Sequence, residues 1–206
     1  MSGFLSVNKQ TENKFLNMYH MEAMDSNQKS FDYYFASRKE REDLVCEKTE
    51  SQLKPDGVLI YAVLKDNPEK IVMIKQYRYP LGRKIMELPA GLIDQGEDAV
   101  SAAIRELKEE TGMTLEPFMG GNPVFSKPFF SAQGLTDECC STVFGYAVGE
   151  SSEKNQEETE DIQVMILEKE QVKEMLNTEQ FSMRSAYLLM NFLQSDPANP
   201  FSFLQI

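Results

Sequence analysis

Three carboxylates at positions 106, 109 and 110 have a spacing that suits divalent-metal chemistry. On a helix that turns about 100° per residue, Glu106 lies one turn from both Glu109 and Glu110, so the three side chains share one face. Like charges at this spacing repel each other, and bound cations relieve the cost. Carboxylate oxygens are hard ligands that suit Mg²⁺ or Mn²⁺. The alternative interpretation is a solvated acidic helix face.

A helix that carries these glutamates is predicted from the apolar spacing around them. Apolar side chains recur at i, i+3, i+4 and i+7, at Val100, Ala103, Ile104 and Leu107. Gly112 stands where a C-terminal glycine cap belongs. Because the acidic stripe lies beside the apolar face, we expect it to border the core. Arg105, four residues before Glu109, is expected to hold that carboxylate in place.

The segments around this helix are expected to alternate between strands and helices. Strands are predicted at 58–64, 71–78, 85–88, 124–130, 142–148 and 162–167, the first two as a hairpin. Helices are predicted at 169–176 and 182–193. Residues 1–28 are polar and are expected to be irregular or a short helix, whereas 31–45 are expected to form strands of an N-terminal arm. Strands mixed with helices predict an α/β sandwich with a mixed sheet.

Length and charge narrow the class of protein. The 206 residues favour one domain with a small extra lobe, which we divide into an arm at 1–54 and a main domain at 55–206. With 21 basic and 33 acidic residues the net charge is −12, which argues against nucleic-acid and membrane partners. The absence of an apolar signal segment at 1–30, and three cysteines without a spaced framework, predict a reducing, cytoplasmic location.

The helix and the loop before it match a known motif at every position. The motif is G-x5-E-x7-R-E-U-x-E-E-x-G-U, where U is a bulky aliphatic residue, and it is filled here by Gly91, Glu97, Arg105, Glu106, Leu107, Glu109, Glu110, Gly112 and Met113. The chain therefore resembles the Nudix hydrolases. The resemblance implies a Nudix-type α/β/α sandwich and hydrolysis of nucleoside diphosphates linked to another group. It also implies Mg²⁺ as the cofactor, with Mn²⁺ as a substitute.

The same resemblance assigns roles within the motif. It makes Glu106 and Glu110 the main metal ligands, with the carbonyl of Ala90 as a further ligand and Glu109 in a catalytic, supporting role. Glu97 and Arg105 are then the groups that fix the loop and the ligand carboxylates.

Sequence outside the motif is similar to the ADP-ribose pyrophosphatase branch of this family. The similar stretches are Gln76–Pro80, Glu87–Gly91, Ser131–Glu138 and Glu157–Ile162, together with Pro128. Gln133 departs from the branch, in which proline or a small residue is more usual. The resemblance implies Glu158 as the general base, with Glu157 and Glu160 as rivals, and Glu160 as a further metal ligand.

The branch also implies substrate contacts and a homodimer whose N-terminal strands help to form the partner's adenine pocket. The implied substrate-binding residues are Arg78, Leu92, Gly134, Glu138 and Phe35. Three alternatives stay open: Arg78 and Glu138 as plain surface residues, Tyr34 in place of Phe35 as the stacking ring, and core packing for both rings.

The function expected from this resemblance is hydrolysis of ADP-ribose to AMP and ribose 5-phosphate. An alternative within the same chemistry is another nucleoside diphosphate sugar, such as GDP-mannose. A third hypothesis is a non-catalytic nucleotide-sugar sensor on the same scaffold, which the intact motif disfavours. In each case the expected ligand is a small nucleotide sugar.

Overall fold

The computed structural model describes residues 3–49, 53–156 and 161–205, which fall into two compact units. The first unit is Met1–Asp56 with Pro128–Cys140, and the second is Gly57–Lys127 with Ser141–Ile206. No helix within these described ranges has the length and apolar character needed to span a membrane.

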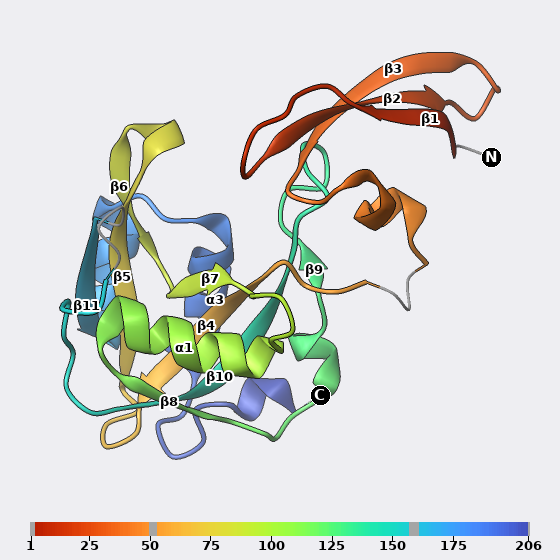
Figure 1. Cartoon of the computed structure of the whole chain (residues 1–206). Coiled ribbons are helices and arrows are strands. Elements are labelled where there is room, and N and C mark those ends of the chain that lie inside the picture. Colours follow the sequence, from red (N-terminus) through yellow and green to blue (C-terminus); the bar gives the residue numbers. More distant parts are fainter. Residues whose placement is uncertain (1–2, 50–52, 157–160, 206) are drawn as a thin grey trace. The chain divides into compact units, whose positions relative to one another are not determined.

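The first unit is built on a three-stranded antiparallel sheet in the order β1-β2-β3 (Figure 1). Its strands are β1 (Gly3–Lys9), β2 (Asn17–Met24) and β3 (Ser30–Ser37), and two short 3₁₀ helices follow at Arg41–Asp43 and Val45–Glu47. Tyr19 lies opposite Phe35 in the β2–β3 register, and the two rings stack at 5.5 Å. With Val7 and Leu44 they form a small core.

The prediction that residues 1–28 are irregular or a short helix is wrong, because two strands lie there. The sheet is thin, and only one of its faces packs on the small core. Most side chains of β1 and β2 therefore remain partly or fully exposed and can be polar. Strands of this kind are stabilised by pairing with their neighbours, and their sequences carry little alternation of apolar and polar residues.

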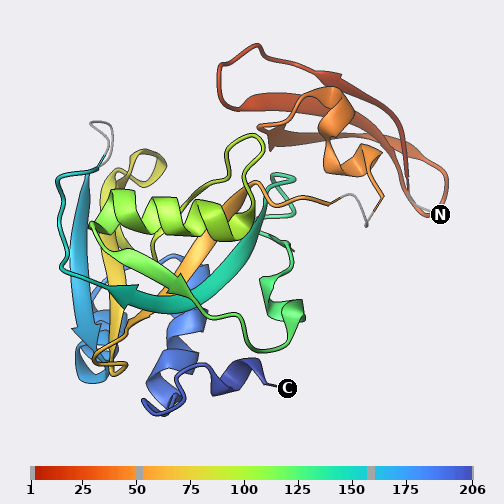
Figure 2. The same cartoon turned by 60° about the horizontal axis from the view of Figure 1, so that its bottom comes forward.

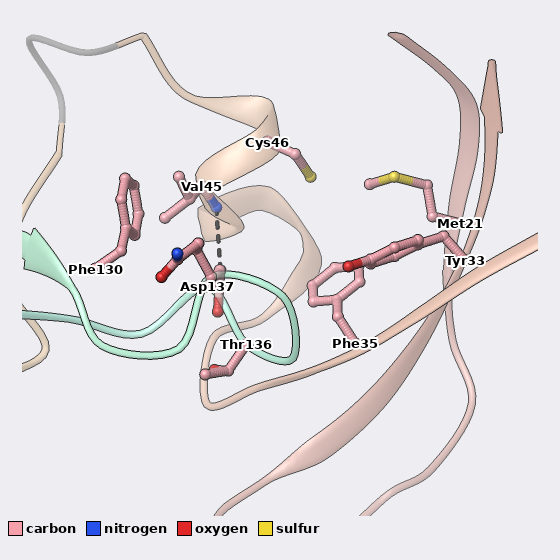
Figure 3. Close-up of a pocket in the computed structure, with 9 residues that line it drawn as sticks. Met21, Tyr33, Phe35, Val45, Cys46, Phe130, Thr136 and Asp137 are labelled. Atoms are coloured by element: carbon pink, nitrogen blue, oxygen red, sulfur yellow. Dashed lines mark hydrogen bonds between the residues drawn. The ribbon is translucent and has the colours of Figure 1, made fainter. Parts of the chain in front are cut away.

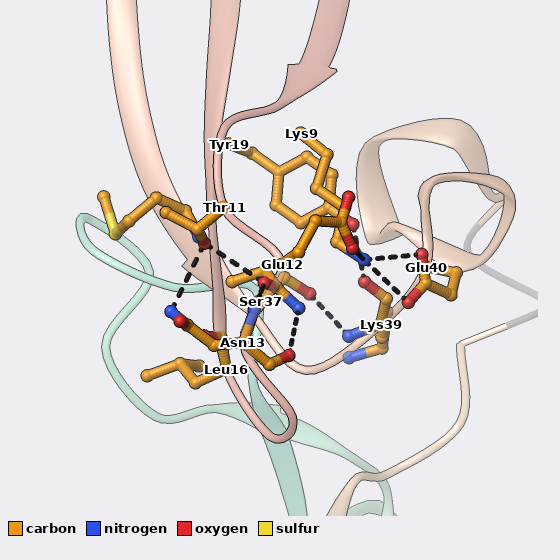
Figure 4. A network of polar contacts seen from close by, with 11 residues as sticks. Lys9, Thr11, Glu12, Asn13, Leu16, Tyr19, Ser37, Lys39 and Glu40 are labelled. Atoms are coloured by element: carbon orange, nitrogen blue, oxygen red, sulfur yellow. Dashed lines mark hydrogen bonds and ion pairs between the residues drawn. The ribbon is translucent and has the colours of Figure 1, made fainter.

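Polar side chains connect the end of this sheet to the segment that follows β3 (Figure 4). The Lys9 ammonium contacts the carboxylates of Glu40, at 3.0 Å, and Glu12, at 3.1 Å. The bond to Glu40 is the main reason that the pKa of Lys9 is raised. The buried Tyr19 donates its hydroxyl proton to the carbonyl of Lys39 at 2.8 Å. These contacts tie β1 and β2 to the segment that follows β3.

The described part of the second unit contains a mixed sheet with the strand order β11-β5-β4-β10-β8, in which β6 pairs with β5 and β7 with β4. Its strands are β4 (Gly57–Leu64), β5 (Lys70–Arg78), β6 (Arg83–Glu87), β7 (Ala90–Leu92), β8 (Thr114–Pro117), β10 (Cys139–Val148) and β11 (Ile162–Glu168). Its helices are α1 (Ala99–Thr111), α2 (Lys169–Thr178) and α3 (Met183–Gln194). Residues Ser202–Leu204 form a 3₁₀ helix.

The second unit has three layers, with α1 on one face of the sheet and α3 on the other (Figure 2). The side chains of strand β4 show why helices cover both faces of the sheet. Successive side chains of a strand point to opposite faces, so Val58 and Ile60 pack with α1, whereas Leu59 and Tyr61 pack with α3. A strand buried on both faces must be apolar throughout, as 58–64 is. The predicted α/β/α sandwich is confirmed.

The predicted strand at 124–130 is largely wrong. Pro123–Ser126 form a 3₁₀ helix, and only the two-residue strand β9 (Phe129–Phe130) follows. Asn122 accepts a bond from the backbone N–H of Val124 at 3.1 Å, and Pro123 sets the helical φ at the first turn. The local capping signal therefore outweighs the apolar run.

Candidate active site

Helix α1 starts and stops at residues that fix its position on the sheet. Asp98 caps the N-terminus by accepting bonds from the backbone N–H groups of Val100, at 2.9 Å, and Ser101, at 2.8 Å. The bond from Ser101 is the largest reason that the pKa of Asp98 is lowered. Gly112 ends the helix with φ of 74°, a left-handed conformation that glycine adopts without strain. With both ends fixed, Leu107 points into the core and the glutamates lie at its border.

The carboxylates of Glu106 and Glu110 meet strand β7 at adjacent residues. Glu110 is 1% exposed and accepts a bond from the backbone N–H of Ala90 at 3.1 Å. The carboxyl carbon of Glu106 lies where a side chain on Gly91 would be, only 1.9 Å from the position of a Cβ atom. The Glu106 carboxylate can therefore hold this position beside β7 only while residue 91 has no side chain.

Arg105 donates hydrogen bonds to three acidic side chains. Its Nη1 atom donates to Glu106 at 2.8 Å and to Glu109 at 3.0 Å. Its Nε and Nη2 atoms donate to Glu97 at 3.2 Å and 2.9 Å, and Nη2 also donates to the carbonyl of Leu92 at 2.9 Å. The bond from Arg105 lowers the pKa of Glu97, and that same bond is the largest cause of a raised pKa for Arg105. Arg105 thus ties the loop before α1 to the helix.

The donor set suits a hard divalent cation, although no three His, Cys, Asp or Glu side chains in the described ranges are arranged to enclose one. Arg105 supplies positive charge to the carboxylates of Glu106 and Glu109. The carboxylates of Glu106 and Glu110 nevertheless converge on β7, and Glu110 is buried there. Carboxylates held in this way are the ligands that Mg²⁺ and Mn²⁺ prefer.

Arg78, at the end of β5, lies on the same face of the sheet as α1. Val72 packs with α1, and positions 72, 74, 76 and 78 of a strand share one face. The Nε atom of Arg78 donates to Glu87 at 2.6 Å, and the Arg78 side chain is 38% exposed. Leu92, at the end of β7, is also exposed.

Two polar residues on this face were given no role by sequence reasoning. Glu87 is 6% exposed, and Gln76 is 7% exposed with its Oε1 atom buried and without a hydrogen-bond partner in the part of the chain that is described. The signal for Glu87 was present in the sequence, because a carboxylate stands between the buried Met86 and Leu88. A carboxylate buried between apolar residues needs a cation nearby.

The remaining expected contacts lie in the first unit. Phe35 is buried against Tyr19 and lines a cavity of about 280 Å³, with Met21, Tyr33, Val45, Cys46, Phe130, Gln133, Thr136 and Asp137 (Figure 3). Tyr34 is mostly exposed. The carbonyl of Gly134 accepts a bond from Tyr33 at 2.9 Å.

Glu138 is held within its own loop. Its Oε1 atom accepts a bond from the hydroxyl of Ser131 at 3.2 Å and lies 3.5 Å from the thiol of Cys140. Of the expected acidic loop, Glu157, Glu158 and Glu160 lie outside the described residues.

The Glu97–Arg105 contact predicts a pH-dependent contribution to stability. Because the folded-state pKa of Glu97 is lowered from 4.5, this contact stabilises the fold above the unfolded-state value and is lost as pH falls through the folded-state value. We expect the melting temperature of wild type to exceed that of Glu97→Gln by a constant amount between pH 6 and 8, and by less and less below about pH 4. Differential scanning fluorimetry across this range measures it, and a difference independent of pH would contradict the assignment.

Comparison with known proteins finds relatives of this chain. The sequence model of the NUDIX domain matches residues 53–188. A putative nudix hydrolase 2 of Caenorhabditis elegans is 45% identical over 120 residues, which are 55% of this chain and 52% of that protein. The ADP-ribose pyrophosphatase of Saccharomyces cerevisiae is 42% identical over 109 residues, 51% of this chain and 46% of that protein. The chain thus spans about half the length of these two relatives.

Two further similarities cover more of the chain. The ADP-ribose pyrophosphatase of Bacillus subtilis is 31% identical over 144 residues, which are 69% of this chain and 74% of that protein. The crystal structure of an ADP compounds hydrolase superposes with a TM-score of 0.68 at 19% identity, over 94% of this chain and 92% of that one, which shows a common fold. By the match of its sequence to the domain and by its relatives, the chain belongs to the NUDIX family.

Proposed function

We propose that this protein hydrolyses the diphosphate bond of ADP-ribose to give AMP and ribose 5-phosphate, in the presence of Mg²⁺ or Mn²⁺. The observation that carries the proposal is the convergence of Glu106 and Glu110 on strand β7 within a complete Nudix motif. The relatives named as ADP-ribose pyrophosphatases support the choice of substrate.

The motif residues would hold the metal. Glu106 and Glu110, with the carbonyl of Ala90 and with Glu160, are the proposed ligands, and Glu109 has a catalytic, supporting role. A divalent cation bound there neutralises the diphosphate and lowers the pKa of a nearby water. Arg105 and Glu97 orient the carboxylates and join the loop before α1 to the helix, so that the ligands keep their geometry.

The reaction also needs a base and contacts to the substrate. Glu158 is the proposed base that takes the proton of the attacking water, with Glu157 and Glu160 as alternatives. Arg78 and Leu92 are proposed to contact the substrate from the second unit, since both are at least one-third exposed. An arginine fork matches the oxygens of a phosphate.

The N-terminal strands of the first unit are proposed to help form the adenine pocket of the partner in a homodimer. Phe35 lines a cavity with mostly apolar walls, which suits a planar ring. Gly134 and Glu138 are the other proposed contacts of this unit. We further propose that the protein is a homodimer in the cytoplasm, with a small nucleotide sugar as its ligand and without nucleic-acid or membrane partners.

A substrate panel tests the proposed function. We expect the release of phosphate monoesters, detected by coupling to alkaline phosphatase, to be at least about tenfold faster with ADP-ribose than with GDP-mannose or a UDP-sugar. Removal of metal with EDTA is expected to abolish the release, and added Mg²⁺ or Mn²⁺ to restore it. Faster turnover of GDP-mannose would contradict the choice of substrate, and tight binding of every compound without turnover would contradict hydrolysis.

A further inference from the structure

Strands β5 and β6 form a hairpin (Figure 1), and two arginines lie opposite each other in its register. Arg78, the last residue of β5, is paired with Arg83, the first residue of β6, so both side chains extend from the same face of the sheet. Residues directly opposite each other on paired strands have Cβ atoms only about 5 Å apart, and like charges in this position are destabilising. In a chain with a net charge of −12, such a pair indicates a place for an anion.

The face that carries the arginines is the one that faces α1. Val72 of β5 packs with α1, and Arg78 is six residues further along the strand, which is an even number. On β6, Met86 belongs to the core on the opposite face, so Glu87 lies on the α1 face. The arginines and the carboxylates of the Nudix motif are therefore on one side of the sheet.

Glu87 holds one edge of the Arg78 guanidinium. Its carboxylate is buried and accepts the Nε proton of Arg78 at 2.6 Å. Within the described ranges, Arg78 donates its side-chain hydrogen bond from Nε, and the side chain is 38% exposed. A guanidinium bound at Nε presents its two Nη groups outward, in the geometry that binds two oxygens of a phosphate.

Arg83 donates one side-chain hydrogen bond to the part of the chain that the structure describes. Its Nε atom donates to the carbonyl of Leu81 at 3.3 Å, and the residue is exposed. The turn before it is sharp, because Gly82 has φ of 62°. This turn places Arg83 beside Arg78, whereas the neighbouring Lys84 pairs with Asp161 at 2.6 Å.

We propose that Arg78 and Arg83 together bind a phosphate group of the substrate, and that Glu87 is a positioning residue that orients Arg78 for this contact. The proposal rests on the proposed function, in which Arg78 contacts the diphosphate. It adds Arg83 as a binding residue and Glu87 as the group that acts through Arg78.

The first test measures binding of inorganic pyrophosphate by calorimetry, in buffer with EDTA so that no turnover occurs. Arg83→Gln is expected to weaken binding about fivefold or more, because one charged contact is lost. Lys70→Gln is the matched control, since Lys70 begins the same strand and pairs with Glu168. Equal weakening by Arg83→Gln and Lys70→Gln, or no binding by wild type, would overturn the proposal.

The sign of the effect of Glu87→Gln separates positioning from simple charge. If Glu87 were only a negative charge near the anion, its removal would strengthen binding of pyrophosphate. We expect weakening of about fivefold instead, because a neutral amide holds the guanidinium less firmly than a carboxylate. Unchanged or stronger binding in this variant would overturn the positioning role.

A double-mutant cycle completes the test. If Glu87 acts through Arg78, then adding Glu87→Gln to Arg78→Gln should cost no further affinity, whereas a general structural role would give additive losses. With ADP-ribose and Mg²⁺, we expect Arg83→Gln and Glu87→Gln to raise KM more than they lower kcat. Because pyrophosphate binding needs no turnover, loss of the proposed activity and loss of this anion site are separate results.

Discussion

Replacing Glu110 by Gln is expected to lower kcat for ADP-ribose by a factor on the order of 10³ while leaving the fold intact. Glu110 is the most buried of the four motif glutamates, and the carbonyl oxygen of a Gln side chain can still accept the bond from the Ala90 N–H. The substitution removes a negative charge but little volume, so the loss falls on cation binding. Metal ions contribute several kcal/mol to such reactions, and each 1.4 kcal/mol is about tenfold in rate.

The control is Glu170→Gln, which removes the same charge from an exposed position on α2. It should change kcat less than about twofold, because charges in solvent are well screened. Glu106→Gln is expected to act like Glu110→Gln, and both variants should bind Mn²⁺ more weakly in a titration followed by electron paramagnetic resonance. Near-normal turnover and Mn²⁺ affinity in both variants would show that these residues are not the metal ligands.

Replacing Gly91 by Ala is expected to reduce kcat about a hundredfold or more without changing any charge. The new methyl group would lie 1.9 Å from the Glu106 carboxyl carbon, so that carboxylate must move away from β7. The obstacle is the end of a flexible side chain, and the backbone at 91 is outside the left-handed region, so the protein should still fold. Displacement of a catalytic group by about 1 Å costs about a hundredfold in rate.

Steady-state kinetics with ADP-ribose, together with the melting temperature, measure this effect. Gly3→Ala is the control, because a methyl group there meets no atom within 4 Å. If Gly91→Ala retains wild-type turnover, the close approach of Glu106 to β7 has no part in the reaction. If it fails to fold, Glu106→Ala/Gly91→Ala, which removes the obstacle, should restore the melting temperature but not the activity.

Local patterns in the sequence were sufficient to predict the helix that carries the motif and the buried strand beneath it. The helix over 99–111 has its apolar spacing, a capping aspartate and a terminal glycine in the sequence itself. The strand at 57–64 is apolar throughout because the sheet is covered on both faces. In these segments local preference and tertiary packing agree, and such agreement makes a prediction from sequence reliable.

The predictions from sequence were wrong where contacts outside the periodic pattern of the segment determine its structure. Strands β1 and β2 have few buried residues, so their alternation was too weak to detect, and pairing within the sheet determines them. At Pro123–Ser126 a capping side chain and a proline outweighed an apolar run.

The sequence by itself determined the chemistry: acidic ligands at fixed helical intervals, the arginine among them, and the glycine that precedes them. These features depend on neighbours along one helix and one loop. Only the tertiary structure decided which side chains meet across strands, such as Glu106 against Gly91, and Glu87 and Arg83 beside Arg78. The register of paired strands and the packing of α1 on the sheet bring these residues together, and such contacts between distant segments leave no period in the sequence.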